Sequence, residues 1–444
     1  MGRTFAGLWS LSPRRSRVQA SGELRDRTPE AAPSERVHYL DWLKVLIVFG
    51  IFIFHVSLVF ATPTWLVSNA QRSRVLTGFA AFAFPWGIPA MFFIAGANSW
   101  FGLRSRSAAK FLHGRFLRLV VPLAAGMVLL SPLQRFVTSH NPPPPIERLP
   151  AFYLDYFQTT QVEWTPVWLS QYSLHLWFLG YLFAISLVCL PALTWLRGGA
   201  GRRLVASLVR FSRRRGAIFI FAVPIALSQL ALRSRFPAYQ DWADIATYTL
   251  VFILGAVIAA DRGFEPAIRR DVRLALGLGV VASIGIGMLV VIDAQRIPMS
   301  VAAVALHDIA YALLWSLNIW SWLLTVLYLG IRWLDVPNRV VDYASESVLP
   351  FYVIHHPVVL VVASFVVAWN AGLWTKFAAI AVLAFAGTLA LYEFGIRRWN
   401  PTRLVFGLRR LPDRRMASLT LLAPATPVAT CKSVSSPAAA TRPD

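Results

Sequence analysis

Apolar residues in this chain gather into long runs that are separated by short, polar, arginine-containing segments. The runs extend for about 20 residues, the length of helix that crosses a hydrocarbon layer of ~30 Å. Only helices or closed barrels pair every backbone group inside a bilayer, and unbroken runs favour helices over barrel strands. The pattern therefore predicts an all-α, polytopic bundle of about ten transmembrane helices, near residues 42–61, 78–102, 116–133, 173–196, 217–232, 245–260, 274–293, 309–330, 347–369 and 376–396.

Composition agrees with a chain that meets lipid over much of its surface. Hydrophobic residues make up 57% of the 444 residues and charged residues only 14%, which differs strongly from soluble proteins. Residues 1–37 are rich in Arg, Ser and Pro and lack the apolar core of a cleaved signal peptide, so the first apolar run acts as the membrane signal. We expect a transmembrane domain at 38–400 between two disordered cytoplasmic tails, 1–37 and 401–444.

The net charge of +22 is concentrated in every second segment between the predicted helices. One set of segments, beginning with the amino terminus, holds 33 Lys and Arg residues, and the alternating set holds 8. Because positively charged loops stay inside, this bias predicts both termini in the cytoplasm, an even number of helices and a plasma (bacterial inner) membrane location. The basic segment 197–215 is expected to contact membrane lipids. Arginines placed between membrane spans do not form a folded basic surface, so no nucleic-acid partner is expected.

Several classes of protein lose support from the sequence. Cys189 and Cys431 lie far apart along the chain and predict no disulfide framework. No metal-ligand spacing, nucleotide-binding glycine loop or Gly-x-Ser-x-Gly elbow occurs, so we expect no metal and no permanently bound cofactor. No internal repeat suggests the inverted halves of a secondary transporter.

Titratable side chains at membrane depth are costly and are therefore candidates for function. The first predicted helix holds three of them, Asp41, Lys44 and His55. At about 100° per residue, the 11 positions from Lys44 to His55 place both side chains on one face, about 16 Å apart along the axis. A histidine there is suited to take a proton from a hydroxyl group. In the alternative interpretation, Lys44 reaches the interface and pairs with Asp41, while His55 bonds to a neighbouring helix.

The second and third predicted helices carry a small-residue patch and two arginines. Gly96 and Ala97 allow another helix backbone to approach closely. Arg115 and Arg118 are three positions apart, which places them on one side of a regular helix at its inner end. Two guanidinium groups there could clamp phosphates, or they could flank the membrane span as topology determinants.

Aromatic residues and one histidine mark the outer segment that leads into the fourth predicted helix. His175 and Trp177 open this helix at the outer interface, where a tryptophan is expected as a belt residue and a histidine is a candidate for lining an acceptor site. Aromatic residues before them form an interfacial belt or stack on a sugar. They are Phe152, Tyr153, Tyr156, Phe157, Trp164 and Trp168.

The ninth predicted helix contains a second group of titratable residues. Tyr352, His355 and His356 lie beside Pro357, which kinks the helix. Adjacent residues on a helix point about 100° apart, so we expect at most one of the two histidines to face a given partner. All three side chains are candidates for supporting the site or lining an acceptor site.

Five short motifs in order resemble the membrane-bound acyltransferase-3 family over residues 36–400. They are the HYLDWLKVL run with a histidine 11 positions after its lysine, FFIAG, RFLR, HLWFL and FYVIHHP. Within this family the chain is most similar to the branch of periplasmic glucan succinyltransferases, the glucan biosynthesis protein C type. The resemblance implies about ten helices, a cytoplasmic acyl-CoA-type donor and acylation of a carbohydrate on the outer side.

The resemblance also implies roles for individual residues. His55 is expected as the catalytic base or transient acyl carrier, and Lys44 as its basic partner, with Asp41 beside it. Arg115 and Arg118 are expected to bind the donor. The sequence departs from the family in two places, Lys44 where many members carry Arg and Ala95 where Ser is common. Because lysine lacks the bidentate fork of arginine, its role differs in detail.

The sequence thus predicts a membrane-bound O-acyltransferase. It would move a succinyl or acetyl group from acyl-CoA to a hydroxyl group of an extracytoplasmic carbohydrate acceptor. The alternative is a transporter or flippase of a glycan or lipid precursor, in which the buried polar groups line a translocation path.

Overall fold

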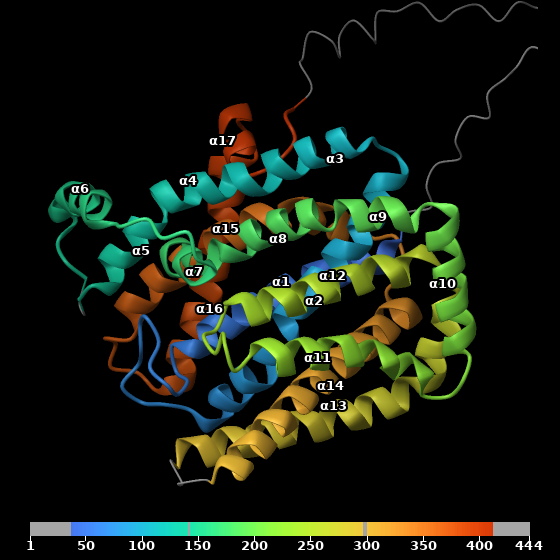
Figure 1. Ribbon diagram of the computed structural model, residues 1–444. Helices are drawn as coiled ribbons and strands as arrows, with labels where there is room; N and C mark the ends of the chain where they lie inside the picture. Colours follow the sequence, from blue (N-terminus) through green and yellow to red (C-terminus); the bar gives the residue numbers. More distant parts are fainter. Residues whose placement is uncertain (1–36, 141–142, 296–299, 412–444) are drawn as a thin grey trace, which may run out of the picture. The chain divides into compact units, whose positions relative to one another are not determined.

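The computed structural model describes residues 37–140, 143–295 and 300–411, and these residues fold into helices without a strand. The chain divides into two units, Met1–Val37 and His38–Asp444, and the description below concerns the second. Its α-helices, shown in Figure 1, are α1 (His38–Leu58), α2 (Arg74–Arg104), α3 (Ala108–Arg115), α4 (Val121–Leu129), α5 (Ser131–Thr138), α6 (Leu149–Thr159), α7 (Pro166–Ser173), α8 (Trp177–Val188), α9 (Leu190–Leu196), α10 (Gly199–Ser212), α11 (Ala222–Leu232), α12 (Trp242–Ala260), α13 (Glu265–Ala294), α14 (Val301–Trp333), α15 (Arg339–Val366), α16 (Leu373–Ala390) and α17 (Asn400–Val405).

Short helical turns of other types connect these elements. Four are 3₁₀ turns, namely η2 (Ile146–Arg148), η3 (Leu174–Leu176), η4 (Ala217–Phe221) and η5 (Arg262–Phe264). Two are π-helical, namely η1 (Phe116–Val120) and η6 (Leu391–Ile396).

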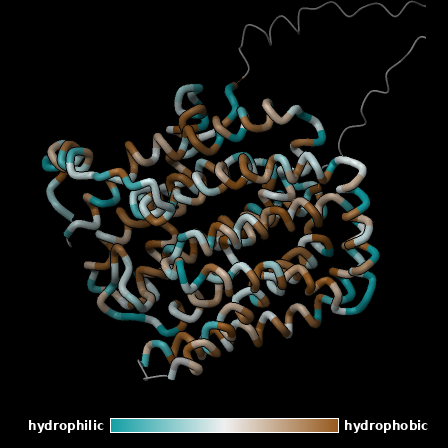
Figure 2. Tube along the Cα trace, viewed as in Figure 1, coloured by the Kyte–Doolittle hydropathy of each residue, from teal (hydrophilic) through white to brown (hydrophobic). Residues whose placement is uncertain are grey.

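The all-α, multi-pass architecture predicted from the apolar runs is confirmed. Within the described ranges, 9 helical segments are long and apolar enough to cross a membrane. The remaining predicted span, 217–232, is an apolar helix that falls short of this length. Figure 2 shows the same alternation along the folded chain. Most hydrophobic residues lie within the helices, and many hydrophilic residues lie at the helix ends and in the connections.

Helices α2 and α12 cross at two glycines, Gly96 and Gly255. This confirms the close approach predicted at Gly96. A Cβ atom at Gly96 would collide with the backbone carbonyl of Phe252, and one at Gly255 would collide with the carbonyl of Phe93. The two backbones therefore touch reciprocally. Because lipid supplies no hydrophobic driving force between helices, such close packing is what holds membrane helices together.

Helix α1 lies among α2, α14, α15 and α16. This position places both ends of α1 against other helices. Along one side of the bundle, α13 and α14 pack against each other as neighbours. Two of the helices around α1, α2 and α15, also contain residues singled out by the sequence.

The basic segment 197–215 is mostly helical. Helix α10 runs across the ends of neighbouring bundle helices in Figure 1. It buries Gly201, Val205 and Val209 and exposes Arg202 and Arg203. An amphipathic helix with one arginine-rich face is suited to the headgroup region predicted for this segment.

The folded part extends beyond residue 400, where we expected a tail. Helix α17 follows the last membrane span, and the side chain of Arg403 in it is 5% exposed. Its guanidinium group contacts Glu346 at 3.0 Å and donates to the carbonyl oxygens of Arg397 and Arg409. These bonds hold residues up to 411 against α15 and η6; the remaining predicted tail residues lie outside the described ranges.

Candidate active site

Four histidines from three parts of the chain meet at one place in the bundle. The ring centre of His55, on α1, lies 5.1 Å from that of His355 and 4.7 Å from that of His356, both on α15. His175, in η3, stacks on His356 at 4.4 Å. The other three rings are buried, with exposed fractions of 0% for His355, 3% for His356 and 6% for His175.

The expectation that at most one of His355 and His356 faces a given partner is wrong. Both rings contact His55. The 100° separation of adjacent residues is correct for the backbone, but an imidazole reaches far enough from the helix for two diverging side chains to flank a third ring.

Hydrogen bonds assign the tautomers of His355 and His55. Nδ1 of His355 lies 2.7 Å from the carbonyl oxygen of Tyr352 and 3.2 Å from that of Phe351. A carbonyl oxygen can only accept, so Nδ1 of His355 carries the proton and Nε2 presents a lone pair. That Nε2 lies 3.1 Å from Nδ1 of His55, which must therefore donate. In neutral His55 the lone pair is left on Nε2.

Pro357 explains why His175 is held beside the other three rings. A proline inside a helix has no N–H, so the carbonyl oxygen four residues earlier, that of Val353, loses its helical partner. Nε2 of His175 donates to this oxygen at 3.0 Å. Tyr352 adds a second link, because its hydroxyl donates to the backbone carbonyl of His175. The other ring nitrogen of His175, Nδ1, is a buried acceptor without a hydrogen-bond partner in the described part of the chain.

Gln134 fixes the fourth ring. Its amide nitrogen donates to the carbonyl of Leu130 at 3.0 Å, which turns Oε1 toward Nδ1 of His356. Because Oε1 accepts, Nδ1 of His356 carries the proton. Each of the four imidazoles thus has one N–H assigned to a specific acceptor and can be neutral.

Trp65 covers His55 and was not identified from the sequence. Its indole stacks on the imidazole with 5.8 Å between ring centres and 28° between ring planes. It lies in the connection between α1 and α2, which is tied down by Arg72, donating to the carbonyl of Val59 at 3.3 Å, and by Lys376, which donates to Asn69. Loop residues follow no period, so the sequence contains no signal that places Trp65 beside His55.

Lys44 and Asp41 lie at the other end of α1, away from the histidines. Nζ of Lys44 is 3.1 Å from Oδ1 of Asp41 and 2.6 Å from Oγ of Ser345, and Ser345 also donates to Asp41. The Lys44–Asp41 pair and the bond from His55 to a neighbouring helix are both features of the alternative interpretation. They are also compatible with function, since the partner of His55 is another titratable ring.

The two arginines of the third predicted helix do not face the same way. The guanidinium group of Arg115 points to α2, where it donates to the carbonyl of Ala95 at 3.2 Å and to the hydroxyl of Ser99 at 2.5 Å. Arg118 is exposed. Within the described residues it has no hydrogen-bond or ion-pair partner, and its electrostatic neighbours include Arg106 and Arg409.

A π turn separates the two arginines. The N–H of Val121 bonds to the carbonyl of Phe116, five residues earlier, and Pro122 has no N–H to offer Arg118. A π turn takes more residues per revolution than an α-helix, so a spacing of three no longer returns to the same side. Such turns often occur at functional sites.

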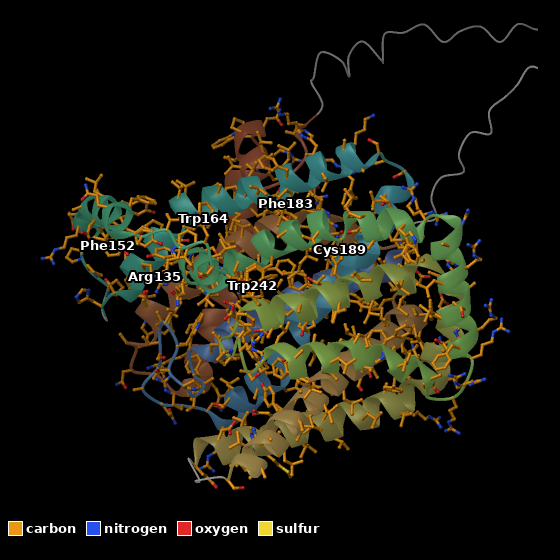
Figure 3. All side chains as sticks on the ribbon, in the orientation of Figure 1. Arg135, Phe152, Trp164, Phe183, Cys189 and Trp242 are labelled. Atoms are coloured by element: carbon orange, nitrogen blue, oxygen red, sulfur yellow. The ribbon has the colours of Figure 1, made fainter. Side chains whose placement is uncertain are left out.

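Trp177 lies beside the histidine cluster and is buried in an aromatic group. Its indole stacks on Tyr248 at 5.8 Å and meets Tyr181 edge-on at 5.0 Å. The stretch before it is also partly packed: Phe152 contacts Phe136 at 5.4 Å, whereas Trp164 is 93% exposed. Figure 3 labels both Phe152 and Trp164. The aromatic residues of this stretch therefore do not form one uniform group: Phe152 packs against the bundle, and Trp164 is exposed.

Four imidazoles in one cluster raise the question of a metal centre. Among the described residues, no group of three or more His, Cys, Asp or Glu side chains is arranged to hold a metal ion. The assigned N–H groups point to carbonyl oxygens, an amide oxygen and a ring nitrogen instead.

Comparison with known proteins places the chain in a family. The family model of the acyltransferase domain, acyltransferase-3, matches residues 37–393, and the chain belongs to this family. Glucans biosynthesis protein C of Escherichia coli O157:H7 is 23% identical over 384 residues, which cover 82% of this chain and 93% of that protein. The protein of the same name from Salmonella paratyphi B is 22% identical over 376 residues, covering 83% and 94%. No solved structure matches.

The family confirms the class of protein that the motifs predicted. The chain is a multi-pass membrane acyltransferase, and glycan modification fits its relatives, whose name refers to the biosynthesis of glucans. Membership of an acyltransferase family favours the enzyme over the transporter or flippase.

Proposed function

We propose that the protein is an O-acyltransferase that moves a succinyl or acetyl group from cytoplasmic acyl-CoA to a hydroxyl group of an extracytoplasmic glycan, with His55 as the general base. The observation that carries the proposal is the directed hydrogen-bond chain from His55 to His355 and on to the carbonyl of Tyr352. It leaves the lone pair of His55 on Nε2, away from the bonded nitrogen.

His55 would act by moving one proton. Nε2 takes the proton of the acceptor hydroxyl while the hydroxyl oxygen attacks the thioester carbonyl carbon, so a C–O bond forms. Collapse of the tetrahedral intermediate breaks the C–S bond, and the protonated His55 returns the proton to the leaving sulfur. Nε2 of His355 accepts from His55 throughout and holds the ring in one orientation, which is the part played by the carboxylate of a catalytic triad.

The donor would enter from the opposite end of α1. Arg118 is the stronger candidate for a phosphate contact, because it is exposed and has Arg106 and Arg409 as electrostatic neighbours. A cluster of guanidinium groups favours a polyanion such as the phosphates of coenzyme A. Arg115 would form the wall of this site, since its guanidinium group already donates to α2. Lys44 and Asp41 would line the route between the arginines and His55.

Acylation in cells tests this proposal. A strain that lacks the gene is complemented with wild type or with His55→Ala, and acyl groups on its envelope glycans are measured by mass spectrometry. Loss of acylation at normal protein level is expected for His55→Ala. The matched control is His307→Ala, because His307 lies outside the cluster and contacts Asp293 at 3.2 Å. Undiminished acylation by His55→Ala would refute the proposal.

A further inference from the structure

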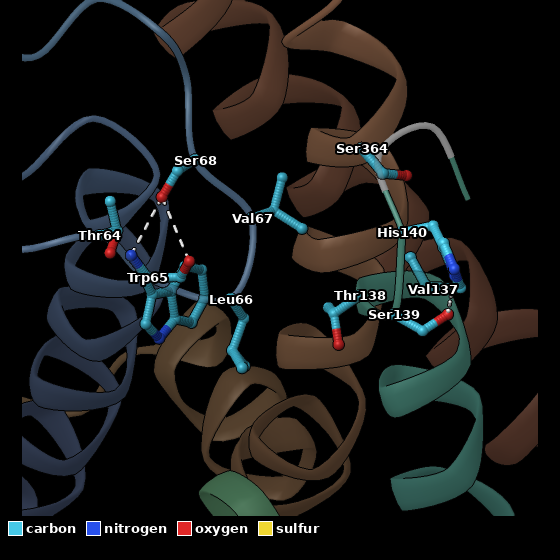
Figure 4. Close-up of a pocket in the computed structure, with 10 residues that line it drawn as sticks. All are labelled: Thr64, Trp65, Leu66, Val67, Ser68, Val137, Thr138, Ser139, His140 and Ser364. Atoms are coloured by element: carbon cyan, nitrogen blue, oxygen red, sulfur yellow. Dashed lines mark hydrogen bonds between the residues drawn. The ribbon is translucent and has the colours of Figure 1, made fainter. Parts of the chain in front are cut away.

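A pocket of about 280 Å³ opens beside the histidine cluster, at the end of α1 that is remote from Lys44. One wall is the connection between α1 and α2, residues 64–68; the other is the end of α5, residues 137–140, with Ser364 from α15. Figure 4 shows these walls facing each other. The volume corresponds to roughly nine water molecules at ~30 Å³ each, room for a ring-sized ligand.

Trp65 belongs both to this pocket and to the histidine cluster. Trp65 is one of the residues that line the pocket, and its ring stacks on His55. A ligand that lies against Trp65 is therefore one residue away from the imidazole of His55. The connection that carries Trp65 is fixed in place, because Ser68 accepts from the Trp65 N–H and donates to the Trp65 carbonyl.

Three of the hydroxyl groups that line the pocket are turned so that they can accept. Those of Thr138, Ser139 and Ser364 donate their protons to helix carbonyl oxygens at 2.9, 2.8 and 2.7 Å. A hydroxyl group has one proton and two lone pairs, so a group that has already donated faces the pocket as an acceptor. Such a lining complements a ligand rich in O–H donors.

The pocket does not suit the acyl donor. The lining residues carry no guanidinium, ammonium or carboxylate group. A coenzyme A-type donor brings several phosphates and would require cations. The lining includes one titratable side chain, the imidazole of His140, and is otherwise made of an aromatic face, apolar side chains and hydroxyl groups. Such a lining matches a neutral sugar better than a polyanion.

We propose that this pocket is the acceptor subsite, in which a neutral sugar ring of the glycan lies on the Trp65 indole and donates hydrogen bonds to Thr138 and Ser364. The inference rests on the proposed function, because it places the acceptor glycan beside Trp65, the residue that stacks on His55. It assigns Trp65 as a binding residue that determines the acceptor, and it leaves the donor contacts at the other end of α1 untouched.

Direct binding tests the subsite without depending on turnover. The wild-type full chain is purified in detergent, and a soluble neutral glucose oligomer is titrated calorimetrically without acyl-CoA, so that no turnover occurs. Adding Trp65→Ala is expected to weaken binding roughly tenfold or more, because loss of a central aromatic contact typically has this effect. Trp65→Phe should retain most of the affinity. The matched control is Trp164→Ala, whose indole is 93% exposed and does not line the pocket.

A second variant covers the case in which Trp65→Ala fails to fold. Thr138→Val keeps the shape of the side chain and removes the accepting oxygen, and it is expected to weaken binding about threefold to tenfold. No binding to the parent protein, or equal affinities of the folded parent, Trp65→Ala and Thr138→Val proteins, would overturn the inference. The proposed function is judged separately by acyl transfer in His55→Ala, so the two can fail independently.

Discussion

His55 and His355 are joined by a hydrogen bond of 3.1 Å between Nδ1 of the first ring and Nε2 of the second. The direction of this bond follows from the carbonyl oxygen of Tyr352, which accepts from the far side of His355. Two helices that are 300 residues apart in sequence thus cooperate to fix one proton. This relationship separates His55, which would meet the substrate, from His355, which positions it.

Substitution of His355 should lower kcat more than it changes the KM for acyl-CoA. His355→Ala leaves the His55 ring free to rotate and to change tautomer, and we expect kcat to fall about 10²-fold. The KM for acyl-CoA should change little, because the proposed phosphate contact is Arg118 and not a residue of the histidine cluster. Steady-state kinetics on purified protein measure both constants. Combining His355→Ala with His55→Ala should add no further loss; an additive effect would show that His355 acts independently of His55.

Pro357 and His175 should be coupled in stability. His175→Phe leaves the Val353 carbonyl buried without a donor, which is expected to lower the free energy of unfolding by about 1–3 kcal/mol. Pro357→Ala supplies a backbone N–H for the same oxygen, so the double variant should recover part of the loss. Thermal unfolding of the four proteins in detergent gives the coupling. If both single effects add without recovery, the proposed reason for the position of His175 is wrong.

The crossing of α2 and α12 should not tolerate a methyl group. Gly96→Ala forces a Cβ into the Phe252 carbonyl, and overpacking of this kind costs about 1–3 kcal/mol. Gly78→Ala on the same helix is the control, because no atom lies within 4 Å of a Cβ there. We expect less folded protein for Gly96→Ala and an unchanged or higher yield for Gly78→Ala, measured by size-exclusion chromatography. Equal yields would contradict the backbone contact.

Substitution of Arg118 should weaken donor binding, whereas substitution of Arg115 should lower stability. Arg118→Ala removes an exposed charge and is expected to raise the KM for acyl-CoA about tenfold, since a charge-assisted hydrogen bond contributes about 1.5–3 kcal/mol. Arg115→Ala removes bonds to α2 and should lower stability instead. Arg203→Ala on α10 is a control for the loss of one exposed arginine. An unchanged KM in Arg118→Ala would remove this residue from the donor site.

Much of the fold could be predicted from the sequence, because each membrane span is an apolar run of about 20 residues. The span near 217–232 is the exception, as its helix falls short of the spanning length. The individual histidines could also be found, since a titratable group at membrane depth is unusual. That four of them meet could not, because the sequence does not say which helices are neighbours.

Local departures from regular helix geometry account for the remaining differences. The spacing of Arg115 and Arg118 was interpreted with the α-helical period, which the π turn breaks. Pro357 was predicted to kink its helix, but its more specific effect is the free Val353 carbonyl that His175 fills. Trp65 lies in a connection whose path depends on the packing of Arg72 and Lys376 rather than on a period.

The central claim is that His55 removes the proton from the acceptor hydroxyl group. The most direct measurement is the initial rate at which purified protein in detergent transfers a radiolabelled succinyl or acetyl group from acyl-CoA to a soluble oligoglucan. His55→Ala and His55→Gln are predicted to lower this rate about 10²- to 10⁴-fold, with His307→Ala near wild type. A wild-type rate of transfer in folded His55→Ala protein would contradict the account.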